Sequence, residues 1–330
     1  MSEPGVALVL AGAVTQGAFA VGALSYLAEK KEGPICRIVA TSSGALSAAV
    51  IAAGVATGRL REATAVAKDL WLDHGAWQDV VHLSPGDLLH VRGASDTSKL
   101  VALVLQGLRQ VVEGAGDGAR QQVKLTIVTT RLTGDRDPAE PLPTYEEPAV
   151  FETADLVDPE RWAEIAAAAA ASATFPGVFA PTMFRGAPHV DGGAVNNAPI
   201  SYVLDDPSVA RVIVITSESS TLDDTKQFGG IRLFGRVTEI AINERIAHDL
   251  AVAKKTNARL ARVREALAGS GATPDTTAAV LHALGWRDLQ LVVVYPDRPL
   301  PGTSFSGFFD RAVRGQYVDA GVRAARAALG

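Results

Sequence analysis

The hydrophobic positions of this chain follow two kinds of pattern. Short continuous runs of aliphatic residues recur along the sequence, and segments rich in glycine or polar residues bound most of them. Continuous runs of this length are typical of strands covered on both faces, as in parallel sheets. The runs interpreted as buried strands are residues 6–10, 35–40, 124–130, 211–216 and 289–295. Because helical stretches separate them, the pattern predicts an α/β protein.

The stretches between these runs have helical periodicity or a helix-forming composition. Residues 60–74 are amphipathic at the helical period, and residues 159–173 combine a proline near the first turn with a run of alanines. The predicted helices cover about 18–30, 45–53, 60–74, 98–112, 159–173, 237–267 (one long helix or a broken pair) and 308–329. Residues 269–277 are expected to form an exposed loop.

We expect one domain spanning residues 1–330. A chain of 330 residues with 48% hydrophobic content can bury a large core. Residues 77–98 lack strong periodicity, which makes a region at about 75–122 the candidate for a cap or mobile loop over a site. A mainly helical part is expected at about 230–330.

Charge and cysteine content narrow the function classes. The formal net charge is −5 and the basic residues are scattered, so we expect no nucleic-acid partner. The single cysteine, Cys36, excludes an internal disulfide and fits a reducing compartment. The apolar opening at 5–28 has no basic residue before it, and Thr15, Gln16 and glycines interrupt it. It therefore predicts neither a signal peptide nor a membrane span, and a soluble, cytoplasmic protein is expected.

One strand ends in a pattern that suggests a nucleophile. The segment Ala40-Thr41-Ser42-Ser43-Gly44 follows a buried strand and precedes an alanine-rich helix. It matches the nucleophile elbow G-x-S-x-G except that Ala40 replaces the first glycine. Ser42 at that corner would lie at a helix N-terminus, where free N–H groups favour developing negative charge. The alternative is that Ser42 or Ser43 is an ordinary N-cap.

The loop after the first strand is a candidate for anion stabilisation. Gly12 to Gly17 joins a strand to a helix, so its backbone N–H groups can bind a phosphate or an oxyanion. A dinucleotide site is disfavoured because G-x-G-x-x-G is absent, and a P-loop fails because Ala18-Phe19 occupies the Lys-Ser/Thr positions. Successive parallel strands end at one sheet edge, so this loop and Ser42 are expected to face each other.

A third candidate segment is Asp191-Gly192-Gly193. Two glycines after an aspartate allow close approach of backbone to substrate or to another segment, although an Asp-Gly hairpin turn is an equally good interpretation of this segment alone. His189 lies two residues earlier and would share a strand face with Asp191, so a Ser-His-Asp arrangement is a further alternative. The remaining histidines are scattered and show no metal-ligand spacing, so no metal or cofactor is expected.

These three segments together resemble the patatin-like phospholipase family. The glycine loop, the elbow and the Asp-Gly-Gly segment occur in the family's order, the last after an Ala-Ser-x-x-x-Pro-Gly-x-Phe stretch at 171–179. Residues 196–200 and 294–296 are also similar to family features. The resemblance implies a three-layer α/β/α fold with a mostly parallel central sheet and helices on both faces.

The resemblance also implies an activity. It is that of a serine lipid acyl hydrolase (phospholipase, lysophospholipase or esterase) with a Ser–Asp catalytic dyad and no cofactor. Ser42 would be the nucleophile, Asp191 the general base, and the loop amides at Gly12, Ala13 and Val14 the oxyanion hole. The implied partner is a lipid or acyl ester, with transient contact at a membrane surface.

The glycine loop departs from the family pattern, because Ala13 and Val14 stand where consecutive glycines and then a basic residue are usual. The alternative function is therefore a catalytically weak or inactive lipid-binding protein on the same fold. If the loop limits catalysis, Ala13→Gly with Val14→Gly should raise turnover, because a valine at positive φ is strained.

A membrane-contact patch is hypothesised in residues 226–236, with an ordered loop of buried apolar side chains as the alternative. The residues concerned are Lys226, Phe228, Arg232, Leu233, Phe234 and Arg236.

Overall fold

The computed structural model describes most of the chain. The described residues are 5–30, 32–82, 95–116, 120–135, 142–204, 206–218, 230–284 and 289–330. The hypothesised patch at 226–236 lies outside the residues whose side chains are described.

The aliphatic runs form a central eight-stranded sheet. Its strands are β1 (Gly5–Leu10), β2 (Ile35–Thr41), β3 (Lys124–Asp135), β4 (Thr144–Phe151), β5 (Thr182–Phe184), β6 (Ala187–Val190), β7 (Val209–Ile215) and β8 (Gln290–Val294). The order is β5-β6-β3-β2-β1-β7-β8, with β4 also paired to β3. The core strands β3, β2, β1, β7 and β8 are parallel, whereas β4, β5 and β6 pair antiparallel. The predicted, mostly parallel sheet is confirmed.

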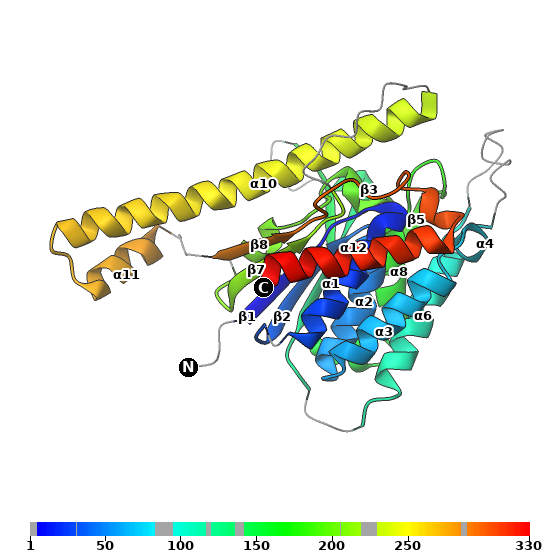
Figure 1. Cartoon of the computed structure of the whole chain (residues 1–330), viewed down its shortest axis with the longest axis horizontal. Coiled ribbons are helices and arrows are strands. Elements are labelled where there is room, and N and C mark those ends of the chain that lie inside the picture. Colours follow the sequence, from blue (N-terminus) through cyan, green and yellow to red (C-terminus); the bar gives the residue numbers. More distant parts are fainter. Residues whose placement is uncertain are drawn as a thin grey trace.

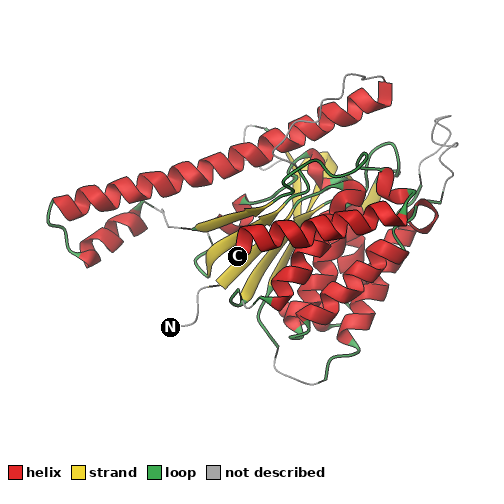
Figure 2. Ribbon diagram, viewed as in Figure 1, coloured by secondary structure: helices red, strands yellow, loops and turns green. Residues whose placement is uncertain are grey.

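Helices cover the sheet and connect its strands (Figure 1, Figure 2). They are α1 (Ala18–Glu29), α2 (Ser43–Ala56), α3 (Leu60–Asp73), α4 (Trp77–Val80), α6 (Ser98–Val112), α7 (Thr153–Val157), α8 (Trp162–Ser172), α9 (Ser201–Leu204), α10 (Gly230–Gly269), α11 (Pro274–Ala283) and α12 (Arg311–Leu329). In the described segments, short 3₁₀ helices lie in loops; they are η1 (Val14–Gly17), η2 (Gly192–Ala194) and η3 (Ser306–Phe308).

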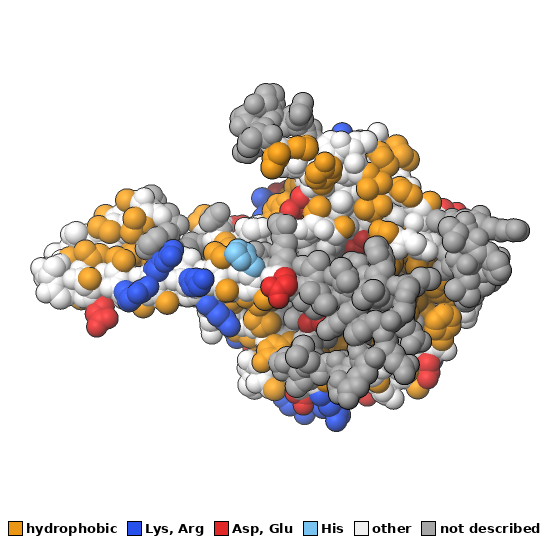
Figure 3. Space-filling view, turned by 90° about the horizontal axis from the view of Figure 1, so that it is seen from above, with side chains coloured by type: hydrophobic (Ala, Val, Ile, Leu, Met, Phe, Trp, Pro, Cys, Tyr) orange, Lys and Arg blue, Asp and Glu red, His pale blue; other side chains and the backbone are white. Residues whose placement is uncertain are grey.

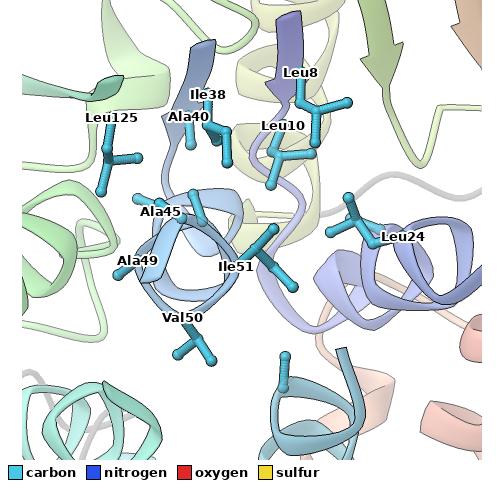
Figure 4. Close-up of a cluster of buried hydrophobic side chains, with 14 of the residues drawn as sticks. Leu8, Leu10, Leu24, Ile38, Ala40, Ala45, Ala49, Val50, Ile51 and Leu125 are labelled. Carbon is cyan, nitrogen blue, oxygen red and sulfur yellow. The ribbon is translucent and has the colours of Figure 1, made fainter. Parts of the chain in front are cut away.

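Alternation along the central strands explains why both faces of the sheet are covered. Leu8, Leu10 and Ile38 belong to the large core formed with α1, α2, α6, α8 and α12, and Figure 4 shows them around α2. Val9 and Val39, one residue out of phase, belong to a second core with α9 and Leu250 of α10. Apolar residues at successive positions, such as Leu8 with Val9 and Ile38 with Val39, therefore serve two layers at once, which gives the three-layer α/β/α architecture.

A helical arm extends from this body. Helix α10 runs beyond the edge of the sheet, and α11 folds back beside its far end (Figure 1). Leu260 and Leu281 are buried in this pair, while basic side chains of α10 are exposed along it (Figure 3). The long helix predicted at 237–267 is confirmed as one continuous helix.

Several local predictions were wrong. The exposed loop expected at 269–277 contains the start of α11, and the strand expected to end at 130 continues to Asp135 through Gly134, whose φ is +61°. The helix predicted from 159 begins at Trp162. Strand β4 and the β5–β6 hairpin were not predicted, because they are short or half-exposed and so lack a continuous aliphatic run.

Candidate active site

Ser42 occupies a sharp turn between β2 and α2. Its φ of 55° and ψ of −134° are unusual for a residue other than glycine, so the backbone stores strain there. The Ser42 N–H donates to Ser172 Oγ at 2.8 Å, and Ser172 in turn donates to the Val128 carbonyl at 2.6 Å. At Gly44 a Cβ would lie 2.6 Å from the Leu10 carbonyl oxygen, so the last elbow position requires glycine.

Ser42 and Asp191 form a buried pair. Ser42 Oγ donates to Asp191 Oδ2 at 2.6 Å, and the Gly193 N–H donates to the other carboxylate oxygen at 2.8 Å. The backbone of Asp191 is held on both sides, by Thr130 Oγ1 donating to its carbonyl at 2.8 Å and by its own N–H donating to the Thr174 carbonyl at 2.9 Å. The carboxylate is thus fixed in position before any substrate binds.

Gly192 allows the Asp191 segment to approach the sheet. A Cβ at this position would lie 2.0 Å from the Val128 carbonyl oxygen, a clash with backbone that no rotamer can relieve. The two residues after Asp191 begin η2 rather than a two-residue hairpin turn. The Asp-Gly-Gly sequence therefore serves close packing against Val128 of β3.

Burial changes the proton affinity of this carboxyl. It raises the pKa of Asp191 from its ordinary 3.8 to about 6, while the hydrogen bonds from Ser42 and Gly193 oppose the rise. Desolvation dominates because a carboxylate loses more hydration on burial than two hydrogen bonds restore. A carboxyl with this pKa is ionised at neutral pH and is also basic enough to accept a hydroxyl proton.

The glycine loop lies against the same turn, as expected from the parallel pairing of β1 with β2. The Gly12 N–H donates to the Asn197 carbonyl at 3.2 Å, and the Ala13 N–H donates to Ser43 Oγ at 2.9 Å. Val14 has a φ of 50°, the strained conformation anticipated for a β-branched residue in this loop. Its N–H has no hydrogen-bond partner among the described residues.

The next residue of the loop is tied to the C-terminal part of the chain. Thr15 is fully buried, and both its N–H (3.1 Å) and its Oγ1 (2.6 Å) donate to the Ser304 carbonyl. The Gly307 N–H donates back to Thr15 Oγ1 at 3.2 Å. Segments some 290 positions apart in sequence therefore hold the strained loop together.

His189 does not bridge Ser42 and Asp191. It is fully buried, and its Nε2 lies 3.2 Å from Glu147 Oε2, while Ser42 donates directly to Asp191. Burial lowers the pKa of His189, and the nearby Glu147 carboxylate partly opposes this. Within the described residues, no cluster of three or more His, Cys, Asp or Glu side chains has the arrangement of a metal site.

An apolar cavity opens from Ser42 and Asp191. Its wall comes from helices α2, α3 and α6, from the loop after α8, and from η3. The lining residues are Val14, Ser42, Ser43, Leu46, Ser47, Val50, Ala67, Leu70, Trp71, His74, Gly75, Val80, Leu100, Leu103, Val104, Ala173, Phe175, Val178, Phe179, Asp191, Phe305 and Phe308.

Ser42, Asp191 and the glycine loop were predicted as site residues, but several residues around them were not. Ser43 was considered only as an N-cap and Ser172 only as part of a motif, although both accept hydrogen bonds that shape the site. Phe305 and Phe308 line the cavity from the far end of the chain. A cluster of three phenylalanines at 305–309 beside glycine and serine was the available signal for this aromatic wall.

This fold and site define an α/β protein in which a serine after the parallel strand β2 is paired with a carboxylate after the antiparallel strand β6. A model of the patatin-like phospholipase family matches residues 8–204, which is more than half of the sequence. The chain therefore belongs to the patatin-like phospholipase family, whose domains are generally lipid acyl hydrolases.

Comparison with individual proteins adds little detail. The crystal structure of VipD from Legionella pneumophila is similar at 14% sequence identity and a TM-score of 0.44. The similarity covers 99% of this chain and 66% of that chain, so the present chain spans just under two thirds of the VipD chain. No curated protein sequence matches this one. No helix in the described part of the chain is long and apolar enough to cross a membrane.

Proposed function

We propose that this protein is a serine-dependent lipid acyl hydrolase in which Ser42 is the nucleophile and Asp191 the general base. The observation that carries this proposal is the 2.6 Å hydrogen bond from Ser42 Oγ to Asp191 Oδ2 at the head of an apolar cavity. A hydroxyl that already donates to a buried carboxylate can transfer its proton as it attacks, without a histidine between them.

In the acylation step, Ser42 Oγ attacks the ester carbonyl carbon and its proton moves to Asp191 Oδ2. The carbonyl oxygen becomes an oxyanion, and the tetrahedral intermediate collapses with cleavage of the bond to the alcohol oxygen. Asp191 returns its proton to that alcohol, which leaves. In the second step Asp191 takes a proton from water, the resulting hydroxide attacks the acyl-enzyme, and the fatty acid departs as Ser42 regains its proton.

The oxyanion requires donors that are free to reach it. Among the expected residues, Gly12 and Ala13 already donate their N–H groups to Asn197 and Ser43, whereas the Val14 N–H is unengaged within the described structure. The Ser43 N–H, in the first turn of α2, is unengaged there as well. We assign Val14 and Ser43 as the donors, an arrangement like that of other elbow enzymes, where the residue after the nucleophile contributes its N–H.

The cavity favours lipids as the substrate class. Its wall is almost wholly apolar, so it stabilises a hydrocarbon chain and offers few partners to a polar acyl group. The ester carbonyl would then lie at Ser42 with the acyl chain inside the cavity. Contact with a membrane surface, where such substrates reside, remains part of the proposal.

A labelled fluorophosphonate tests the chemistry directly, because only an activated serine reacts with it covalently. We expect one adduct on the wild-type protein and none on Ser42→Ala, together with hydrolysis of at least one member of a panel of phospholipids, lysophospholipids and simple esters. A folded wild-type protein that takes up no label and hydrolyses none of the panel would refute the proposal.

A second candidate function has its own support. Gly12 and Ala13 donate their N–H groups within the protein, so these two loop donors are not free to bind an oxyanion. This favours a catalytically weak or inactive lipid-binding protein. The same label separates the two functions. Binding of a fluorescent fatty acid without labelling of Ser42 would favour the binding protein.

A further inference from the structure

The cavity follows the surface of α2 away from the nucleophile. Three turns of that helix contribute to its wall, at Ser43, at Leu46 with Ser47, and at Val50. Val50 lies seven residues after Ser43, so the cavity extends about 10 Å along the helix axis at a rise of about 1.5 Å per residue. The depth of the cavity is therefore set by a regular element.

Helix α3 runs along the same cavity with its chain direction reversed, and its lining residues indicate the same depth. A short turn joins α2 to α3, and the lining residues of α3 run from exposed His74 beside the active site back to buried Ala67. These two positions are also seven residues apart. Both helices thus place the active-site end at one level and the far end about 10 Å deeper.

The far end is closed. Val50, Ala67 and Val104 are all buried, with exposed fractions of 1%, 2% and 3%. One turn beyond Val104, the backbone of α6 comes so close to α2 that a Cβ on Gly107 would lie 2.6 Å from Val50 Cγ2 and 3.0 Å from Leu70 Cδ1. An occupant of the cavity therefore has no exit between these helices.

The polar pair halfway along the cavity is bonded within the protein. Trp71 Nε1 donates to Ser47 Oγ at 2.9 Å, so the indole N–H needs no partner from a ligand. Below this pair the wall contains only aliphatic side chains. The deep half consequently favours saturated hydrocarbon over a hydroxylated or charged chain.

We propose that this cavity selects acyl chains of medium length, about eight carbons, with Val50, Ala67 and Val104 as the residues that set the limit. The proposal rests on the proposed hydrolase function. An extended chain advances about 1.25 Å per methylene, given C–C bonds of about 1.5 Å, so a depth of about 10 Å holds roughly eight carbons beyond the ester. A longer chain meets a closed, packed end, and the first methylene that finds no room lowers kcat/KM by roughly tenfold or more.

The test is a competition among p-nitrophenyl esters from butanoate to hexadecanoate, each kept below its aggregation concentration, with the released fatty acids quantified by mass spectrometry. Competition yields ratios of kcat/KM directly. We expect a maximum near octanoate and a loss of at least about 100-fold at hexadecanoate. A maximum at hexadecanoate, or equal rates across the series, would overturn the proposal.

Two variants and one control test whether these residues set the limit on acyl-chain length. Ala67→Leu fills the deep end, so octanoate hydrolysis should fall at least about tenfold while butanoate hydrolysis stays within about threefold of wild type. Val50→Ala enlarges the same end and should move the optimum to a longer chain. Ala65→Leu makes the same chemical change on the exposed side of α3 and should leave the profile unchanged.

The outcomes remain separable if one variant fails. Thermal melting identifies any variant that does not fold, and Val50→Ala carries the test if Ala67→Leu is such a case. Unchanged chain-length profiles in both folded variants would reject the assigned residues. Loss of all ester hydrolysis and of fluorophosphonate labelling in the wild type would instead refute the hydrolase itself.

Discussion

The two halves of the site differ in how fully hydrogen bonds hold them in place. The Ser42–Asp191 half is fully connected: each carboxylate oxygen accepts one hydrogen bond, and the backbone of both residues is held by buried neighbours. The loop half carries Val14 at a φ of 50° and donates two of its first three N–H groups to the protein itself. The groups proposed to transfer the proton are therefore already positioned by hydrogen bonds, whereas the proposed oxyanion stabilisation depends on one strained turn at Val14.

The largest expected effect comes from the connected half. Ser42→Ala and Asp191→Asn should each lower kcat by at least about 10³-fold, and the double variant should be no worse, because nucleophile and base act as one unit. Single-turnover hydrolysis of a soluble ester measures this. His189→Gln should retain most activity because His189 lies beside Glu147. Retained activity in Asp191→Asn together with its loss in His189→Gln would reverse the assignment.

The pH dependence of catalysis reports on the same carboxyl. Because the pKa of Asp191 is raised to about 6, kcat/KM should rise tenfold per pH unit up to about pH 6 and level off above it. The measurement is kcat/KM on an ester whose own ionisation lies outside this range. A profile that stays flat down to about pH 4.5 would remove Asp191 as the base.

Stability should show the cost of burying that carboxylate. The folded protein binds the Asp191 proton more tightly than the unfolded chain, so this stabilising contribution is complete below about pH 3.8 and is lost as pH rises through about 6. The stability of Asp191→Asn relative to wild type should therefore increase by roughly 2 to 3 kcal/mol between about pH 4 and pH 8. Urea unfolding at the two pH values measures it, and a pH-independent difference would contradict it.

The loop half should respond more weakly. Ser43→Ala removes the acceptor of the Ala13 N–H, which frees the start of the loop, and we expect kcat to fall about tenfold with KM within about twofold. Thr64→Val is the matched control, since it removes a buried hydroxyl on α3 that does not line the cavity. Equal losses in the two variants would indicate a general structural effect rather than a role in orienting the loop.

The smallest effect is expected at Val14. Glycine adopts positive φ without the strain of about 1 to 2 kcal/mol borne by valine, but it adds entropy to the unfolded chain. Val14→Gly should therefore raise the free energy of unfolding by roughly 0.5 to 1 kcal/mol, and turnover should rise because the donating conformation is populated more fully. Thermal melting and kcat/KM test both parts. A variant that melts lower and turns over more slowly would show that the side chain of Val14 holds the loop.

Much of this architecture could be predicted from local sequence. The run at 6–10 is apolar at every position, and the run at 35–40 is apolar except at Arg37. Strands buried on both faces require such runs, so β1 and β2 were found almost to the residue. Ser42 and Asp191 were found because a nucleophile turn and a closely packed aspartate need small neighbours, and Gly44, Gly192 and Gly193 supply them. Such steric requirements involve residues close together in the chain, so the local sequence is enough to reveal them.

Contacts between distant segments were decided only by the tertiary structure. Which loop N–H groups remain free depends on Asn197 and Ser43, and the position of Thr15 depends on Ser304 and Gly307. No local pattern encodes such pairings, because each residue alone is an ordinary polar or small residue. The depth of the cavity likewise follows from three helices whose lining residues lie up to about 60 positions apart, since packing, and not periodicity, brings Val50, Ala67 and Val104 to one level.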